Sequence, residues 1–266
     1  MEFQAGMENE PLMVVCSGGV ATITLNRPER RNAITQAMWH DIAVRVRSCA
    51  ADDTNRVIVL RGAGSDFSAG ADISEFSTLR AGGASARAYE AANSAAFAAL
   101  REARLPVIAA IRGICFGGGF GLAAACDLRI AADDALFSVP AARLGLAYPA
   151  DAMADIVGAL GQQMAKYLAF SGARIDAATA RDAGFVLDVV EPDRLESRVA
   201  GLAAAIAENA PLSVRASKAS IRAAVSGRSE DVDDARALGD LTFDSADYAE
   251  GRAAYLQKRR PAFEGR

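Results

Sequence analysis

Two glycine-rich turns are the segments of this sequence whose residue types and spacing could do chemistry. The first turn, "DFSAGADI" (66–73), and the second turn, "CFGGGFGL" (115–122), each follow a buried strand-like run and lead into a helical run. A helix start leaves backbone N–H groups without partners, and two such turns side by side direct these donors to one point. Converging N–H groups stabilise a thioester oxygen that becomes enolate-like. One glycine cluster alone would indicate only a tight turn or close packing, but two in successive strand-to-helix units favour a site.

Other glycine-, serine- or metal-based sites do not fit the residues. Neither turn matches G-x-G-x-x-G, and no glycine precedes Lys-Ser or Lys-Thr, which argues against a dinucleotide fingerprint and a Walker loop. "SDFSAG" is not G-x-S-x-G, and the single histidine, His40, is expected on a helix surface, so a serine hydrolase would lack its base. One histidine, four dispersed cysteines and no acidic cluster predict no metal site.

Charge and hydropathy narrow the class of protein further. The chain has 29 Lys and Arg against 33 Asp and Glu, a net charge of −4, and no basic stripe, which argues against a nucleic-acid partner. It has no apolar run of about eighteen residues, so we expect no membrane span. The start, "MEFQAGMENEPLM", lacks a basic region followed by an apolar one. We therefore expect no secretory leader and a cytoplasmic protein.

The elements that must position the two turns alternate between strands and helices. Gly18-Gly19 between two β-branched runs predicts a hairpin, and Thr35 should cap an amphipathic helix over 35–50. Strands are then expected at 57–62, 105–113 and 128–132, with helices around 84–104 and 120–127 between them. Such alternation implies crossover connections and largely parallel pairing. Beyond residue 150 the pattern predicts helices over 151–170, 176–183, 193–209, 211–225 and 231–258. The fold class is therefore α/β, with a core over 12–200 and a helical region over 201–266.

Six segments form an ordered set: "LNRPERRNAI", "DFSAGADI", "VIAAIRGICFGGGFGLAAACDLRIAADDALFSVP", "RLGLAYP", "SGARIDAATARDAGFVLDVV" and "YLQKRRPAF". From about residue 12 to 263, this set resembles the enoyl-CoA hydratase/isomerase (crotonase) family. The resemblance implies a crotonase-like spiral of ββα units with a helical C-terminal subdomain, and a homotrimer or a dimer of trimers. It also implies an acyl-CoA substrate, with coenzyme A as part of the thioester and no permanently bound cofactor.

The resemblance assigns roles to individual positions. The family's oxyanion hole corresponds to the backbone N–H groups of Ala71 and Gly118. Its CoA-binding positions correspond to Arg30, Arg31, Ala33, Ser68, Ala69, Asp72 and Ile73, with Lys258 and Phe263 reaching the nucleotide end, often from a neighbouring subunit. Outside the family context, Arg30 and Arg31 would be taken for ordinary solvated charges.

At two positions the sequence departs from the family pattern. Hydratases of this family carry glutamates where this chain has Gly121 and Ala141, and hydration needs an acid and a base near the substrate. Asp151 and Tyr148 follow in the region that lines the acyl pocket of relatives, and we expect them to supply acid–base or positioning groups. Asp151 could equally be a helix cap, and Tyr148 a pocket wall.

Two functions from different classes follow from this pattern. The first is an enzyme, a lyase or isomerase that processes acyl-CoA thioesters through a stabilised enolate, for which simple enoyl-CoA hydration is doubtful. The second is an acyl-CoA-binding protein without efficient chemistry, because both glutamate positions lack a carboxylate. A hydrolase would need a base that the sequence does not offer.

Overall fold

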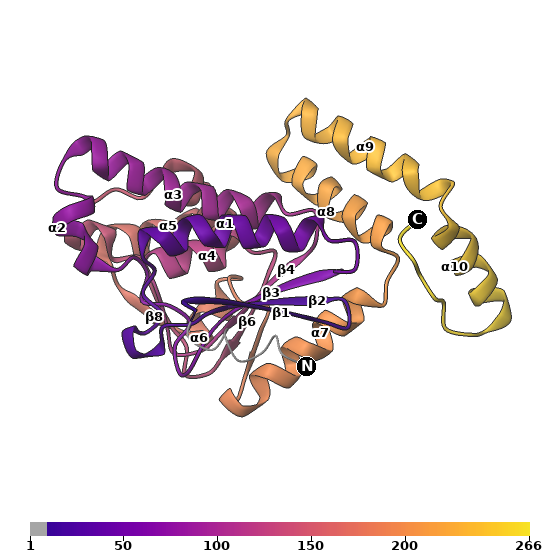
Figure 1. The fold of residues 1–266 in the computed structure, drawn as a ribbon, viewed down its shortest axis with the longest axis horizontal. Coiled ribbons are helices and arrows are strands. Elements are labelled where there is room, and N and C mark those ends of the chain that lie inside the picture. The colour runs from indigo at the N-terminus through magenta and orange to yellow at the C-terminus, as the bar shows by residue number, and fades with distance from the viewer. Residues whose placement is uncertain (1–9) are drawn as a thin grey trace.

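The structure is a computed structural model that describes residues 10–266 (Figure 1). The expected absence of a secretory leader concerns mainly residues 1–9, which lie outside the described residues. The chain begins with an antiparallel hairpin of β1 (Leu12–Ser17) and β2 (Val20–Leu25). Gly18 and Gly19 have φ angles of 58° and 80°, the left-handed region that a two-residue turn needs. The predicted hairpin is confirmed.

The main sheet has six strands in the order β1-β2-β3-β4-β6-β9. Its further strands are β3 (Val57–Gly62), β4 (Val107–Ile111), β6 (Leu128–Ala132) and β9 (Asp188–Val190). Every pair from β2 onward is parallel, so each connection must cross over the sheet. The predicted parallel pairing is confirmed, and the carboxyl ends of β3 and β4 bring the two glycine-rich turns to one edge.

Helices cover both faces of this sheet (Figure 1). On one side lie α1 (Gln36–Ala51), α3 (Gly83–Glu102), α4 (Gly118–Ala125) and α5 (Ala150–Ser171), which share a large apolar core with the sheet. On the other side α7 (Leu195–Ala207) buries Leu195, Val199 and Ala203 against β3, β4 and β6. The α1 helix begins as predicted, because the Thr35 side chain accepts a hydrogen bond from the Met38 N–H at 3.3 Å.

A second, three-stranded sheet was not expected from the sequence. It joins β5 (Ile114–Phe116), β7 (Leu136–Ser138) and β8 (Arg174–Asp176). Both β8 and β9 lie mainly between the helices predicted beyond residue 150, where no strand was predicted. Three residues are too few to show a strand periodicity, so the sequence carried no usable signal. Short elements complete this part: α2 (Phe76–Leu79), α6 (Ala177–Asp182), and the 3₁₀ turns Pro28–Arg30, Ile73–Glu75, Pro140–Leu144 and Pro192–Arg194.

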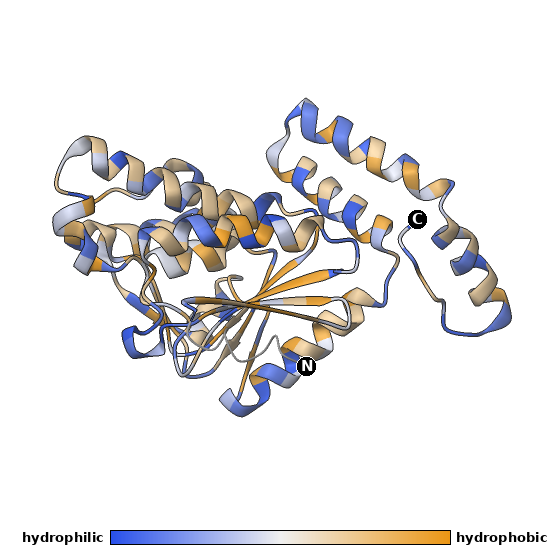
Figure 2. Cartoon of the chain, viewed as in Figure 1, coloured by the Kyte–Doolittle hydropathy of each residue, from blue (hydrophilic) through white to orange (hydrophobic). Residues whose placement is uncertain are grey.

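The C-terminal helices project from the core (Figure 1). They are α8 (Pro211–Ser226), α9 (Ser229–Phe243) and α10 (Ala246–Gln257). One continuous helix over 231–258 was expected, and this expectation is wrong, because α9 ends at Phe243. The Ser245 hydroxyl accepts a hydrogen bond from the Tyr248 N–H at 3.0 Å and caps the start of α10. Figure 2 shows apolar and polar residues alternating along α9 and α10. The division into two domains at residue 200 stays a prediction; α7 spans that position.

Two further features of the fold concern α4 and the lengths of the helices. Arg129 on β6 caps the C-terminus of α4, because its guanidinium donates to the carbonyl oxygens of Ala123 at 3.1 Å and Cys126 at 2.7 Å. This arginine therefore satisfies acceptors that a helix C-terminus leaves free.

Within residues 10–266, no helix combines the length and the apolar character needed to cross a bilayer.

Candidate active site

The first turn is paired along its length with the segment that follows β2. The Ile34 N–H donates to the Gly70 carbonyl at 2.8 Å, and the Asp72 N–H donates to the Ile34 carbonyl at 2.9 Å. Ile34 and Ala71 thus form a parallel bridge, while the Ala69 N–H donates to the Arg31 carbonyl at 2.8 Å. The structure therefore brings the predicted CoA-binding positions after "NRP" beside those of the first turn.

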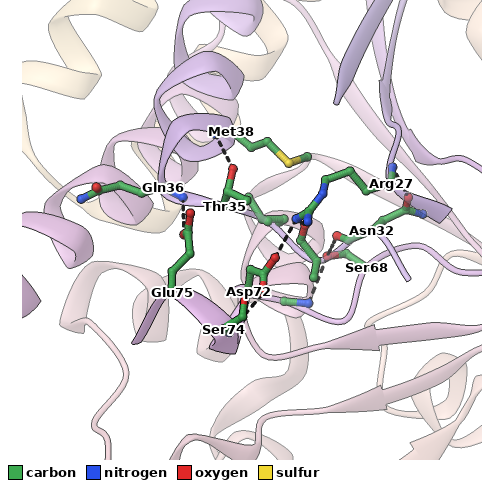
Figure 3. Close-up of polar contacts among 12 residues, drawn as sticks. Arg27, Asn32, Thr35, Gln36, Met38, Ser68, Asp72, Ser74 and Glu75 are labelled. Carbon is green, nitrogen blue, oxygen red and sulfur yellow. Dashed lines mark hydrogen bonds and ion pairs between the residues drawn. The ribbon is translucent and has the colours of Figure 1, made fainter. Parts of the chain in front are cut away.

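An ion pair locks these two segments together (Figure 3). The Arg27 guanidinium donates to the Asp72 carboxylate at 2.8 Å and to the Ala33 carbonyl at 2.7 Å, and Ser74 donates its hydroxyl to the same carboxylate at 2.7 Å. The hydrogen bond from Ser74, with further help from Arg27, lowers the pKa of Asp72 below its ordinary value. The Asp72 carboxylate therefore holds the turn through its bonds to Arg27 and Ser74, and a direct contact from Asp72 to CoA stays a prediction.

Ser68 has a similar internal role (Figure 3). Its hydroxyl is buried, donates to the Asn32 carbonyl at 2.8 Å and accepts from the Gly70 N–H at 3.0 Å. Asn32 is itself buried with a left-handed φ of 54°, and its amide donates to the Asp66 carbonyl at 2.7 Å. The first turn is therefore held rigidly by side-chain hydrogen bonds, and a direct contact from Ser68 to CoA stays a prediction.

The second turn lies directly against the first. The Phe116 N–H donates to the Ser68 carbonyl at 3.0 Å, and a Cβ built on Gly70 would lie only 2.9 Å from the Gly118 nitrogen. A Cβ on Gly118 would in turn lie 3.5 Å from the Ala71 nitrogen. Neither the Ala71 nor the Gly118 N–H has a hydrogen-bond partner among residues 10–266. The two donors predicted from the sequence are adjacent and free.

Neighbouring side chains lie so close to Gly118 and Gly119 that a Cβ at either position would overlap them. A Cβ on Gly118 would meet the Trp39 ring at 2.7 Å, and one on Gly119 would meet Ser68 at 2.8 Å. Both distances are shorter than real carbon contacts, so the glycines are required for the close approach. Trp39 is fully buried on α1, whereas its neighbour His40 is exposed, as expected.

Gly121, where the family resemblance leads us to expect a glutamate, is enclosed by side chains from other segments. A Cβ on Gly121 would lie 2.7 Å from the Phe97 ring and 3.1 Å from the Tyr148 hydroxyl. Tyr148 donates that hydroxyl to the Gly117 carbonyl. Although the residue as a whole is half-buried, its hydroxyl is enclosed, and this burial raises the pKa of Tyr148 far above its ordinary value. Tyr148 is therefore a neutral donor that supports the second turn.

Two carboxylates on α5 face α3, the helix that also carries Phe97. Asp151 accepts a hydrogen bond from the Ser94 hydroxyl at 3.4 Å, and Asp155, one helical turn further, pairs with the Arg101 guanidinium at 2.6 Å. Burial raises the pKa of Asp155, and the Arg101 charge opposes this effect. Asp155 is engaged by a full ion pair, whereas Asp151 has only one long hydrogen bond and is the freer of the two.

The remaining predicted positions fall into two groups. Arg30, Arg31 and Ile73 are exposed close to the first turn. Lys258 ends α10, and Phe263 lies against the same helix, close to Gly251, where it lines a hollow of about 480 Å³. Figure 1 shows α10 well apart from α4, so one chain does not bring Lys258 and Phe263 to the glycine-rich turns.

Sequence reasoning missed the residues that shape the site without doing chemistry. Trp39 and Phe97 were expected only as helix residues, and Arg27 was passed over although it precedes the proline of "NRP". The one signal for Arg27 was its place in that segment. No local pattern could reveal that Phe97 meets Gly121, because the contact joins segments 24 residues apart in sequence.

Comparison with known proteins identifies the family of this chain. The model of the enoyl-CoA hydratase/isomerase family matches residues 16–266. The chain belongs to that family. A probable enoyl-CoA hydratase from Mycobacterium leprae is 34% identical over 98% of this chain and 100% of its own length. A 2,3-dehydroadipyl-CoA hydratase from Escherichia coli is 32% identical over 93% of this chain and 96% of its own. The crystal structure of an enoyl-CoA hydratase/carnithine racemase from Magnetospirillum magneticum superposes with a TM-score of 0.91 at 37% identity, covering 97% of this chain and 96% of that one.

Membership of the enoyl-CoA hydratase/isomerase family confirms the fold expected from the six segments. The crotonase fold is shared at high similarity, and the family acts on CoA thioesters. Residues 10–266 contain no cluster of three or more His, Cys, Asp or Glu side chains that could hold a metal ion.

Proposed function

We propose that this protein is an enzyme that binds an acyl-CoA thioester with its carbonyl oxygen between the N–H groups of Ala71 and Gly118. The observation that carries this proposal is the adjacency of these two free donors on turns held in place by hydrogen bonds and ring packing. A thioester oxygen that gains charge on enolisation strengthens both hydrogen bonds, because charge-assisted bonds are about twice as strong as neutral ones. The site thereby favours the enolate over the bound substrate.

Two side chains complete the proposed site. Asp151 is the carboxylate that we assign to proton transfer, since its only hydrogen bond among the described residues is a long one from Ser94. Tyr148 holds the Gly117 carbonyl and so fixes the direction of the neighbouring Gly118 N–H. Its raised pKa supports a donor role and disfavours a role as base. The reaction class is an isomerisation, elimination or related step through an enolate, with ordinary hydration disfavoured by Gly121 and Ala141.

CoA is proposed to bind between the segment after "NRP" and the first turn. The exposed Arg30 and Arg31 offer cations for its phosphates, while Ala33, Ala69 and Ile73 offer backbone and apolar contacts. Lys258 and Phe263 belong to this site only if a neighbouring subunit supplies them. The assembly that we propose is a homotrimer or a dimer of trimers.

Exposed apolar side chains on the projecting helices support such an assembly. Tyr255 and Leu256 on α10 are 84% and 82% exposed, and Phe243 ends α9 with a largely exposed ring. Apolar surface of this extent on a protruding element is typical of a subunit interface. Light scattering should give a mass of three or six chains, and replacing Leu256 with Glu should lower it. A monomeric wild-type protein would contradict the assembly.

A second candidate function is acyl-CoA binding without efficient turnover. The close packing of Phe97 and Tyr148 against Gly121 favours it, since no carboxylate can enter there without displacing a ring. Both functions predict that CoA thioesters stabilise the folded protein, by about 2.7 kcal/mol at a ligand concentration a hundred times Kd. They differ in whether product forms.

One experiment separates the two functions. The protein is incubated with enoyl-CoA, 3-hydroxyacyl-CoA and malonyl-CoA thioesters of several chain lengths, and both thermal stabilisation and product formation are measured. Stabilisation with turnover supports the enzyme, and stabilisation with no turnover on any compound supports the binding protein. If no thioester stabilises the protein, both proposals fail.

The role of Asp151 is tested on any substrate that turns over. Asp151→Asn should lower kcat by more than about tenfold, because general acid–base groups contribute about 10² to 10⁴. Asp182→Asn, on an exposed position of α6, is the matched control and should leave kcat unchanged. An unchanged rate in Asp151→Asn would remove this carboxylate from the mechanism.

A further inference from the structure

Arg80, which follows the last residue of α2, is a fixed cation without a charged partner. Its guanidinium carbon lies 4.5 Å from the ring centroids of both Phe76 and Tyr89, two rings set at 81° to each other. Its Nε is buried and has no hydrogen-bond partner, and no carboxylate of residues 10–266 lies within 4 Å of its nitrogens. Buried donors are normally satisfied, so a free Nε–H on a stacked guanidinium indicates a place for an acceptor.

The Tyr89 ring connects Arg80 to the segments that border the two glycine-rich turns. The Tyr89 hydroxyl donates to the Ile34 carbonyl at 3.3 Å and accepts from the Trp39 indole N–H at 3.3 Å. Ile34 is the residue that bridges to Ala71, and the Trp39 ring is the one that borders Gly118. Tyr89 is buried, and this burial raises its pKa to about 12, so it carries no charge that could neutralise Arg80.

A second unsatisfied polar group lies on the same face of α3. Asn93 is one helical turn beyond Tyr89 and only 8% exposed, and its amide oxygen has no hydrogen-bond partner among the described residues. Phe97 is a further turn along and meets Gly121, so this helix face borders the second turn. A half-turn of the Asn93 amide presents two N–H donors at this place instead of an acceptor.

We propose that Arg80, assisted by Asn93, binds a carboxylate at the far end of the acyl group, so that the substrates are CoA thioesters of dicarboxylic acids. This inference rests on the proposed function, since it presumes that the thioester end lies at Ala71 and Gly118. A carboxylate approaching the edge of the guanidinium accepts from Nε–H and one Nη–H together, which satisfies the free donor in the geometry that arginine favours. The two rings hold the guanidinium in place, and its Nε–H has no partner among the described residues.

Adipyl-CoA and hexanoyl-CoA provide a matched pair of probes. They have the same number of acyl carbons and the same CoA, and they differ only in the terminal carboxylate. Calorimetric titration of the full-length protein should show adipyl-CoA binding at least about tenfold more tightly, as expected for a charge-assisted bidentate contact. Equal affinities would overturn the proposal while leaving the proposed function intact. If neither compound binds, the proposed function fails as well.

Variants of Arg80 assign the preference to this side chain. Arg80→Gln should abolish the preference for adipyl-CoA and change hexanoyl-CoA affinity less than about twofold, whereas Arg80→Lys should retain part of it, because lysine keeps the charge without the fork. Arg87→Gln, an exposed arginine on α3, removes the same charge and should keep the full preference. Asn93→Leu should lower the preference by a smaller factor than Arg80→Gln.

Two results from these variants would overturn the proposal. A preference for adipyl-CoA that persists in Arg80→Gln would show that another group binds the carboxylate. An equal loss of affinity for both thioesters in Arg80→Gln would show that Arg80 contacts the CoA phosphates instead. Circular dichroism of each variant must match the wild type, and Arg80→Lys keeps the test informative if Arg80→Gln folds poorly.

Discussion

The two glycine-rich turns lie against each other but are held by different means. Polar side chains fix the first turn: Arg27 pairs with Asp72, and Ser68 bonds to backbone on both sides. The second turn depends on glycines that have no side chain, because the rings of Trp39 and Phe97 occupy the space that a Cβ on Gly118 or Gly121 would need. One donor of the proposed site therefore depends on hydrogen bonds and charge, and the other depends on apolar packing.

The largest effect should come from removing one donor of the second turn. Gly118→Pro deletes the N–H, and proline is compatible with the first position of a helix. Gly118→Ala is the matched control, since both variants place a Cβ against Trp39 but only proline removes the donor. On any thioester that turns over, kcat of the proline variant should be about 10² to 10³ lower than that of the alanine variant. Equal rates in the two variants would exclude the Gly118 N–H from catalysis.

A smaller effect should follow from overfilling the second turn. Gly121→Glu introduces the carboxylate that the family resemblance leads us to expect at this position, but its Cβ would press on the Phe97 ring at 2.7 Å. We expect this variant to lose about 1–3 kcal/mol of unfolding free energy, the usual cost of overpacking, and to gain no hydratase activity. Denaturant unfolding measures the loss, with Gly158→Glu, on an open face of α5, as control. Equal unfolding free energies of Gly121→Glu and Gly158→Glu would show that the Phe97 ring moves aside without cost.

The smallest effect concerns the polar first turn and depends on pH. Asp72 has a lowered pKa in the folded protein, so its ionised form stabilises the fold above the ordinary value of 3.8, and this contribution is lost as pH falls through the folded pKa. Asp72→Asn should cost about 0.2–1 kcal/mol at pH 7, the range for an ion pair that stays partly open to solvent. The difference from wild type should shrink at pH 3. A difference in unfolding free energy that stays constant with pH would contradict this role.

Local sequence signals were sufficient for the elements that position the site. The Gly18-Gly19 hairpin, the helix capped by Thr35 and the paired glycine-rich turns each carry their own pattern, and all are present. Signals were insufficient where structure depends on distant partners. The ion pair of Arg27 and Asp72 spans 45 positions, and the ring contacts of Gly118 and Gly121 come from two other helices.

Short elements and helix breaks were the other limit of sequence reasoning. Strands of three residues, such as β5 and β8, are set by their neighbours in the second sheet and not by any periodicity. The break at Ser245 was readable as a serine cap, but the charged and apolar pattern on both sides suited one long helix equally well. Tertiary packing decided in both cases.

Arg129, which caps the C-terminus of α4 from β6, has an electrostatic consequence for the proposed site. Each peptide unit of α4 adds to a dipole whose positive end is at Gly118 and whose negative end is at the carbonyls held by Arg129. Because Arg129 neutralises the negative end, the field at the place proposed for the thioester oxygen comes mainly from the positive end of the helix. A helix of eight residues without a charged side chain is in this way polarised toward one atom.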